Sequence, residues 1–401
     1  MRPIRRIASL ALATTLAVGG LTFITSTAAP AAPVKYRQFN SCGAAAAGFA
    51  RCMAVARVAV NAVSPAATSP SGKSPTNLIS AYALPSATAG SGQTVAIVDA
   101  YDDPYAEADL AVYRSYYGLP ACTTANGCFK KVSQTGSTTS LPAANAGWSQ
   151  EISLDIDMVS AICPNCKILL VEATSASFAN LGTAVNEAAA LGANAISNSY
   201  GSTGDARDTT YGKYYNHPGI AVTASSGDSG YGASYPASSH YVTAVGGTTL
   251  TAAAGTTRGW TETAWSGAGS GCSSYNTALT GAASFSTGCT RRAEADVSAV
   301  ADPATGVSVY DSYGITAGWY TFGGTSVSSP IIAGVYALAG TPSTGSYPAK
   351  FPYSHAGTSA LNDVTTGNNG TCTTSYFCTA TTGYDGPTGW GTPEGVTAFA
   401  G

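Results

Sequence analysis

The feature that most constrains the fold is an alternation of apolar runs and helical stretches that begins at residue 94. The run 94–99 is apolar and ends in a carboxylate, as a buried parallel strand would. Similar patterns follow along the chain: expected helices at 104–117, 150–162 and 178–191, and expected strands at 167–172, 194–198 and 219–224. Strands that alternate with helices build a parallel sheet with right-handed crossovers. We therefore predict an α/β fold with a parallel sheet flanked by helices.

Composition permits a large core and argues against nucleic acid as a partner. Hydrophobic residues make up 45% of the 401 residues and charged residues 10%, which excludes global disorder despite the 46 glycines. The formal net charge is −3, whereas binding to phosphates needs a basic face. No stretch after the N-terminal region is long and apolar enough to span a bilayer.

The N-terminal region predicts an export signal. Arg2, Arg5 and Arg6 precede an apolar run over 7–24, and an alanine-rich stretch follows at 28–32. A membrane anchor could begin in the same way, but the alanine- and proline-rich exit favours cleavage. We predict a signal peptide over 1–32 and a secreted, extracellular protein that has no membrane contact after cleavage.

Two further segments follow the expected signal. Residues 33–90 are rich in alanine, serine and proline and poor in strand patterns, so we predict a short pro-segment or N-terminal arm and linker there. Residues 91–401 are expected to form the main domain.

The ten cysteines fall into five close pairs. An even number behind an export signal indicates disulfides, although sequence alone leaves their connectivity open. Cys163 and Cys166 could also form a redox or zinc motif, but a second such pair or a nearby histidine is missing. Nearest-neighbour pairing is the working hypothesis: Cys42–Cys52, Cys122–Cys128, Cys163–Cys166, Cys272–Cys289 and Cys372–Cys378.

Ser326 lies in the stretch Gly-Gly-Thr-Ser-Val-Ser-Ser-Pro, just before an apolar stretch at 331–339 that predicts a helix. A serine at a helix start lies beside free backbone N–H groups that can hold an oxyanion. An isolated serine there could equally be a simple N-cap. A nucleophilic serine also needs a base. His217, His240 and His355 lie outside any recognisable motif, so we expect none of them to serve.

Carboxylates in the expected helix 150–162 are better candidates for the base. Glu151 and Asp155 lie about 40° apart on a helical wheel, on the apolar face of that helix. Asp157 falls on the opposite, polar face, where we expect a solvated carboxylate. Carboxylates that point into an apolar stripe are either hydrogen-bonded structure or functional groups.

Asp99, Ser199 and Asp228 each follow an expected strand, and ligand sites in parallel sheets lie beyond the carboxyl ends of strands. Asp228 lies in Ser-Ser-Gly-Asp-Ser-Gly, where a turn aspartate is the ordinary interpretation. A protonated aspartic acid there could instead donate a hydrogen bond to an oxyanion.

Together these motifs resemble the sedolisin (serine-carboxyl peptidase) family, in particular its kumamolisin-like bacterial members. The resemblance covers about residues 81–401 and depends on 151–156, 225–230, 235–248 and 323–326, in matching order. It implies a subtilisin-like fold in which a glutamate replaces the histidine base.

The resemblance also implies residue roles. Ser326 would form the acyl-enzyme, Glu151 would be the general base and Asp155 would orient it, while protonated Asp228 would support the oxyanion. An ionised glutamate and a neutral aspartic acid coexist most readily in acid, because their reference pKa values are about 4.3 and about 3.9. The expected function is a secreted, monomeric serine-type peptidase that cleaves proteins or peptides at acidic pH, as an endopeptidase or as a tripeptidyl peptidase.

A C-terminal loop region, 362–370 with 381–393, resembles the family's calcium site. An all-oxygen ligand set suits a hard cation, and glycine-rich turns are the alternative. The resemblance implies one structural Ca²⁺ held by the carboxylates of Asp363 and Asp385 and by backbone carbonyls of Val364, Thr381 and Gly383.

The chain departs from its relatives around the proposed base. Asp99 stands where they place a glutamate that supports the base, and Tyr200 stands where they place a tryptophan that contacts the equivalent of Asp155. Only a short arm precedes Ala81, where precursors of the family carry a large pro-domain. Residues Ser199 to Gly201 are expected to bind extended substrate as a strand edge.

Two other functions remain open. A subtilisin-type triad could use Asp99 as its acid, but it lacks a placed histidine. A catalytically inactive secreted binding module on the same fold is the alternative from another class.

Overall fold

An eight-stranded sheet forms the centre of the computed structural model, which describes residues 34–60, 66–279 and 287–401. Its path is β12-β11-β9-β7-β4-β6-β5, and β15 also pairs with β11. Every pairing is parallel except that of β11 with β12. The predicted parallel α/β sheet is therefore confirmed. The strands are β4 (Thr94–Ala100), β5 (Phe129–Ser133), β6 (Lys167–Ala173), β7 (Ala195–Asn198), β9 (Ala221–Ser225), β11 (Thr243–Ala252), β12 (Trp260–Ala264) and β15 (Val297–Val300).

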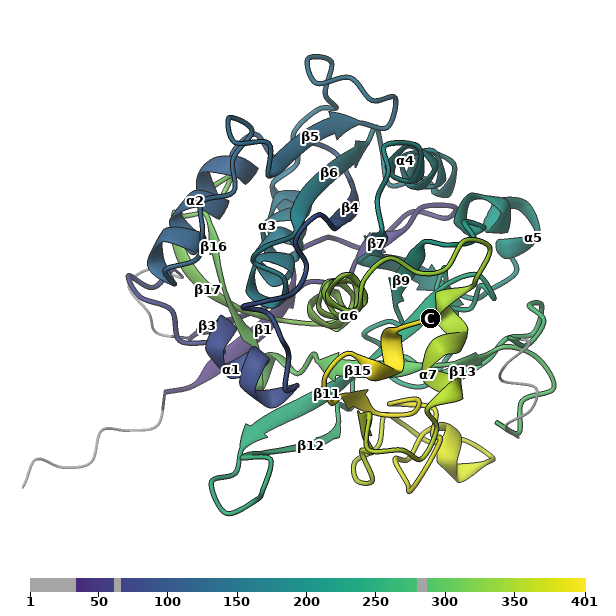
Figure 1. Ribbon diagram of the computed structural model, residues 1–401. Coiled ribbons are helices and arrows are strands. Elements are labelled where there is room, and N and C mark those ends of the chain that lie inside the picture. Colours follow the sequence, from purple (N-terminus) through teal and green to yellow (C-terminus); the bar gives the residue numbers. More distant parts are fainter. Residues whose placement is uncertain (1–33, 61–65, 280–286) are drawn as a thin grey trace, which may run out of the picture. The chain divides into compact units, whose positions relative to one another are not determined.

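The two faces of this sheet belong to two hydrophobic cores. Val95 and Ile97 of β4 pack in one cluster with residues of α3 (Ala146–Ile162) and α6 (Thr325–Ala339). Ala96 and Val98 pack in another with residues of α4 (Phe178–Ala190). Since side chains alternate along a strand, α3 and α6 cover one face of the sheet and α4 covers the other (Figure 1).

Further helices and short strand pairs surround the central sheet. The expected helix 104–117 is α2 (Ala106–Tyr116), and the expected helix 331–339 starts earlier, at Thr325. The other helices are α1 (Pro75–Ala81), α5 (Asp208–Tyr211) and α7 (Phe351–Ser354), and the other strand pairs are β13 (Gly271–Cys272) with β14 (Ala293–Glu294) and β18 (Leu361–Asn362) with β19 (Thr392–Pro393).

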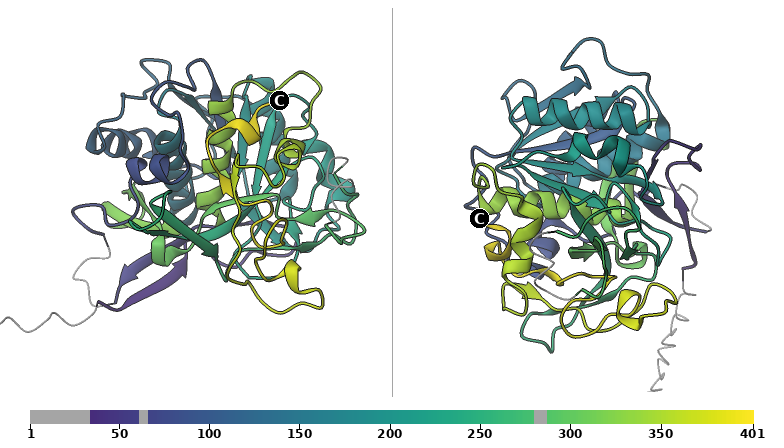
Figure 2. Two further views of the ribbon diagram at one scale, coloured as in Figure 1. Left: turned by 60° about the horizontal axis from the view of Figure 1, so that its bottom comes forward. Right: turned by 90° about the vertical axis from the view of Figure 1, so that its right-hand side faces the viewer.

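The predicted N-terminal arm contributes strands, although its sequence is poor in strand patterns. Strands β1 (Tyr36–Asn40) and β3 (Val55–Ala59) extend an antiparallel sheet in the order β1-β3-β17-β16, with β16 (Val307–Asp311) and β17 (Gly318–Gly323). Strand β2 (Arg51–Cys52) joins β8 (Tyr200–Thr203) and β10 (Ser234–Tyr235). The arm, coloured purple, runs along the body of the domain in both views of Figure 2.

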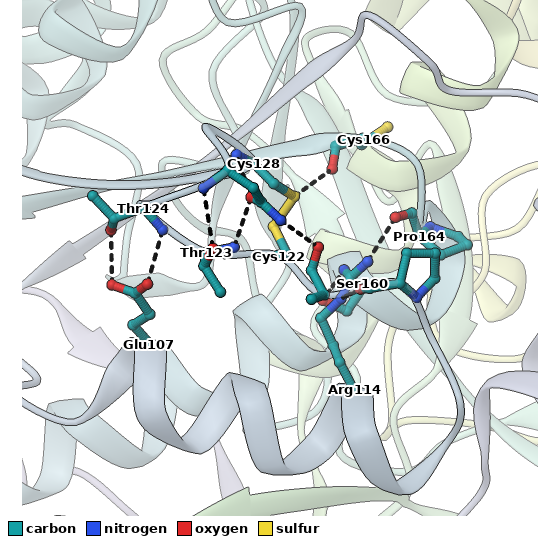
Figure 3. The surroundings of a disulfide bond; sticks show 12 residues. Glu107, Arg114, Cys122, Thr123, Thr124, Cys128, Ser160, Pro164 and Cys166 are labelled. Carbon is teal, nitrogen blue, oxygen red and sulfur yellow. Dashed lines mark hydrogen bonds between the residues drawn. A yellow bond between two sulfur atoms is a disulfide. The ribbon is translucent and has the colours of Figure 1, made fainter.

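All five predicted disulfides are formed with the nearest-neighbour connectivity. Figure 3 shows Cys122–Cys128 beside the guanidinium of Arg114, which donates to the Ser160 hydroxyl at 3.0 Å and to the Pro164 carbonyl at 2.7 Å. These bonds satisfy a buried cation and join α2 to the end of α3.

Residues 35–401 form one compact unit. The predicted signal peptide, 1–32, lies outside the described residues. Within the described ranges, no helix has both the length and the apolar character needed to cross a membrane.

Candidate active site

Ser326 lies in the first turn of α6, where Thr325 separates it from the pair Gly323-Gly324. Gly324 takes a φ of +92°, a conformation that favours glycine, and ends β17 so that the helix can begin. Pro330 has no N–H, so the carbonyl of Ser326 lacks its helical partner. The Ser199 hydroxyl donates to that carbonyl instead, at 3.4 Å. The Ser326 hydroxyl in turn donates to the Ser199 carbonyl at 3.2 Å. The serine is therefore held between α6 and the end of β7.

Glu151 faces Ser326 from α3. Asn145 caps this helix by accepting from the N–H groups of Gly147 and Trp148. Glu151 is fully buried, and its Oε2 accepts a 2.8 Å hydrogen bond from the N–H of Ala54. Burial raises its pKa well above the usual value, and the neighbouring Asp155 raises it further. Interactions with Ser326 and Ala54 oppose this rise, because both stabilise the ionised carboxylate.

Asp155 and Asp99 complete a buried acid cluster with Glu151. Burial raises the pKa of Asp155, and the charge of Asp99 adds to this, while interactions with Ser199 and Glu151 oppose it. Burial raises the pKa of Asp99 in the same way, followed by the charge of Glu151. Ionising all three buried acids at once would be unfavourable, because their negative charges repel one another. The cluster therefore keeps protons at pH values where isolated acids would lose them.

The hydroxyl of Tyr200 makes its hydrogen bonds outside this acid cluster. Its hydroxyl donates to Asn198 Oδ1 at 2.7 Å and lies 3.3 Å from the hydroxyl of Tyr215. The Asn198 side chain donates to the Thr223 carbonyl. Tyr200 therefore supports strand β8, which lies between β10 and β2, through a polar network that the sequence did not reveal.

Asp228 lies on the other side of the Ser326 turn. Its Oδ1 accepts from the N–H of Thr325 at 2.8 Å and from the Thr325 hydroxyl at 2.9 Å. Its Oδ2 is buried beside Gly324 and has no hydrogen-bond partner among the described residues. Burial raises the pKa of Asp228 to about 6, against the hydrogen bonds from Thr325 and the charge of Arg51. The group can therefore be a neutral donor in mild acid.

The structure thus brings Ser326, Glu151, Asp155, Asp99 and Asp228 together, and their catalytic roles stay predictions. It contradicts one expectation, because Asp157 is not solvated. It is 1% exposed and accepts from the N–H of Tyr310 at 3.1 Å. The physical reason is that α1, α2 and β16 cover the side of α3 that the wheel assigned to solvent.

The three histidines have partners elsewhere. His217 contacts Asn186 and the Tyr214 carbonyl, and His355 contacts the Phe351 carbonyl. His240 lies 4.0 Å from Asp208. These positions agree with the expectation that a carboxylate, not a histidine, adjoins Ser326.

The C-terminal loops place the two candidate calcium carboxylates near each other. Asp385 Oδ2 accepts from the N–H of Thr381, and Asp363 Oδ2 accepts from the N–H of Gly383. Asp385 is fully buried, and the charge of Asp363 adds to the rise that burial causes in its pKa. Two neighbouring carboxylates suit a hard cation, which would relieve their repulsion, although both also accept from backbone N–H groups of these turns.

Comparison with known proteins is consistent with this geometry. The model of the subtilase family matches residues 134–351, a range that contains Glu151, Asp155, Asp228 and Ser326. The chain belongs to the subtilase family.

Within this family the chain is a sedolisin-type, kumamolisin-like member. It is 29% identical to kumamolisin from Bacillus sp. (strain MN-32) over 362 residues, which is 82% of this chain and 63% of kumamolisin. It is 38% identical to sedolisin from Pseudomonas sp. (strain 101) over 176 residues, or 40% of this chain and 29% of that protein. The chain therefore spans less than two thirds of these relatives' length.

The structure of Pseudomonas sedolisin, a serine-carboxyl proteinase complexed with two molecules of pseudo-iodotyrostatin, has a similar fold. Its TM-score is 0.68 at 28% identity, over 81% of this chain and 96% of that one. This match supports the subtilisin-like architecture predicted for this subtilase.

Proposed function

We propose that this subtilase is a secreted serine-type peptidase that hydrolyses peptide bonds at acidic pH. The observation that carries the proposal is the meeting of one serine, Ser326, with a buried carboxylate, Glu151, at the carboxyl ends of parallel strands. Ser326 Oγ attacks the substrate carbonyl and transfers its proton to Glu151. Glu151 then passes that proton to the leaving amine, and water resolves the acyl-enzyme by the reverse route.

The neighbouring acids set the conditions of the reaction. Asp155 and Asp99 hold Glu151 in an acidic cluster, and Asp155 orients it. Neutral Asp228 donates a hydrogen bond to the oxyanion from its Oδ2, which has no other partner among the described residues. Because this role needs the neutral acid, the enzyme works in acid. Substrate adds a strand to the edge at Ser199–Gly201.

The C-terminal loops would hold one structural Ca²⁺ through Asp363 and Asp385, with the carbonyls of Val364, Thr381 and Gly383. The ion would contribute stability and no chemistry at Ser326. Export is proposed from the basic and apolar pattern of residues 1–32, and the enzyme is proposed to act as a monomer on proteins or peptides.

Covalent labelling tests the function. Acid-treated protein should react with a peptide-aldehyde or fluorophosphonate probe at Ser326, located by mass spectrometry, and Ser326→Ala should not. A folded protein that neither reacts nor cleaves a denatured protein at pH 3–5 would instead be a binding module.

A further inference from the structure

Residues 51–53 of the arm lie where a substrate strand is expected. Strand β2 pairs antiparallel with β8, with Arg51 opposite Gly201 and Cys52 opposite Tyr200. The N–H of Met53 then donates to the Ser199 carbonyl at 3.2 Å. The arm therefore makes the backbone contacts that an extended peptide would make at this edge.

The Met53–Ala54 peptide group is aligned with the reacting groups. The Met53 N–H and the Ser326 hydroxyl donate to the same carbonyl oxygen, that of Ser199, which sets Met53 beside the serine. The N–H of Ala54 points the other way, to Glu151 Oε2 at 2.8 Å. That nitrogen is the atom which a general acid must protonate when a Met53–Ala54 bond breaks.

The carbonyl of Met53 faces the expected oxyanion site. A Cβ on Gly324 would collide with the Met53 oxygen and would lie 2.8 Å from Asp228 Oδ2, so both oxygens lie beside the same glycine. Nucleophile, base and oxyanion donor thus surround one peptide bond, each on the side where hydrolysis needs it.

The chain is also held beyond this bond. Val55 pairs with Gly323 and Ala56 with Phe322, so β3 is anchored to the strand that leads into Ser326. Met53 and Ala54 are buried, and they enclose Glu151 and Ser326, whose exposed fractions are zero. While the arm stays in place, no other peptide can reach Ser326.

We propose that Met53–Ala54 is the chain's own cleavage site, cut by Ser326 of the same molecule. This inference rests on the proposed function and names its first substrate. Ser326 Oγ bonds to the Met53 carbonyl carbon and gives its proton to Glu151. The Met53–Ala54 C–N bond then breaks, and Glu151 returns the proton to the Ala54 nitrogen.

One water molecule completes the hydrolysis. It adds to the Met53 ester carbon and gives one proton to Glu151, which returns a proton to Ser326 Oγ as the ester bond breaks, so Met53 ends in a carboxyl group. Cys42 and Cys52 both lie before the cut. No covalent bond therefore ties the released segment to the enzyme, and it is held by the pairing of β1 and β2, by backbone bonds such as that of Ala50 to Ala176, and by buried side chains.

The test is incubation of the full chain at pH 3–5 with N-terminal sequencing over time. The wild type should acquire the new N-terminus Ala-Val-Ala-Arg-Val, at a rate unchanged over a tenfold range of protein concentration. Ser326→Ala should keep the arm, and Ala54→Pro, which removes the N–H to Glu151, should slow the cut at least 100-fold. Val60→Ala, an exposed position of the same arm, is the matched control and should be cut normally.

Met53→Pro separates this inference from the proposed function. It removes the N–H to Ser199, so the arm should leave the cleft uncut and an added peptide with residues 48–58, Cys52 replaced by serine, should be cleaved. If this variant cleaves the peptide but the wild type starts anywhere other than Ala54, the self-cleavage site is wrong and the peptidase stands. If neither the variant nor the wild type cleaves its own arm or the added peptide, the proposed function fails and this inference fails with it.

Discussion

The backbone N–H of Ala54 donates a 2.8 Å hydrogen bond to the buried carboxylate of Glu151, 97 positions further along the chain. The acceptor is the group proposed to exchange protons with Ser326, and the donor belongs to an arm that occupies the substrate edge. This contact places the proposed base within reach of a peptide nitrogen. The following predictions concern that base and its surroundings.

Glu151→Gln should lower kcat by about 10²–10⁴-fold while the protein stays folded, because glutamine keeps the shape but cannot take the serine proton. Initial rates on a fluorogenic peptide at pH 4, with circular dichroism as the check on folding, measure this. Glu187→Gln, a carboxylate on α4, is the matched control and should keep wild-type rates. Equal rates for both variants would favour a triad based on Asp99.

The pH–rate profile should fall above about pH 6. Burial raises the pKa of Asp228 to about 6, and the proposed role needs its neutral form, so activity is lost as the pH rises through that value. Asp228→Asn keeps a donor that does not titrate. This variant should lose less activity than the 10²–10³-fold decrease in kcat typical of losing an oxyanion donor, and its alkaline limb should move to higher pH. If the alkaline limb is unchanged in this variant, a group other than Asp228 causes it.

Stability should fall as the pH rises from about 4 to 7. Burial is the main cause that raises the pKa of Asp103 and of Asp311 to about 7 in the folded chain. An acid whose folded pKa exceeds its unfolded pKa holds its proton longer when folded, so raising the pH through that window favours unfolding. Urea midpoints of Ser326→Ala at pH 4 and pH 7 measure the effect without self-digestion.

Asp311→Asn tests the cause of that slope. Asparagine can still accept the N–H of Tyr313, which Asp311 Oδ1 accepts at 3.1 Å, but it has no proton to lose. The difference between the two urea midpoints should shrink in this variant and stay the same in Glu187→Gln. If the difference between the two midpoints is the same in Ser326→Ala, in Asp311→Asn and in Glu187→Gln, Asp311 does not cause the pH dependence of stability.

Chelation should lower the melting temperature by several degrees. A calcium concentration 100-fold above the dissociation constant stabilises the folded state by about 2.7 kcal/mol, and a chelator removes this. Asp363→Asn should melt at the lower temperature with or without chelator, whereas wild-type protein should respond. Scanning calorimetry of Ser326→Ala in both conditions provides the measurement, and a chelator-insensitive transition would refute the calcium site.

The helices and strands of the main sheet were predictable because their signals are local. The run at 94–99 is β4 almost residue for residue, since a strand buried on both faces must be apolar throughout. The sequence left the connectivity of the cysteines open, and the structure confirms the working hypothesis of nearest-neighbour pairing. The burial of Asp157 was not predictable, because a helical wheel shows which side of a helix is polar but not what packs against that side.

The contacts of the arm lay beyond prediction. Residues 33–90 are poor in strand patterns, and the strands at 51–59 form because β8 and β17 offer backbone groups to pair with on either side of Ser326. The network of Tyr200 with Asn198 and Tyr215 was hidden in the same way. No spacing rule links residues that meet only after the sheet has formed.

The sequence by itself determined the chemical types available: a serine at a helix start, two carboxylates one helical turn apart and an aspartate after a strand. Those features follow from neighbours within a few positions, where backbone geometry is fixed by local rules. Only the tertiary structure decided that Glu151 is enclosed beside Ser326 and that Ala54 donates to it. Burial and long-range hydrogen bonds arise from packing of distant segments, and they set both the protonation of these acids and the peptide bond that they surround.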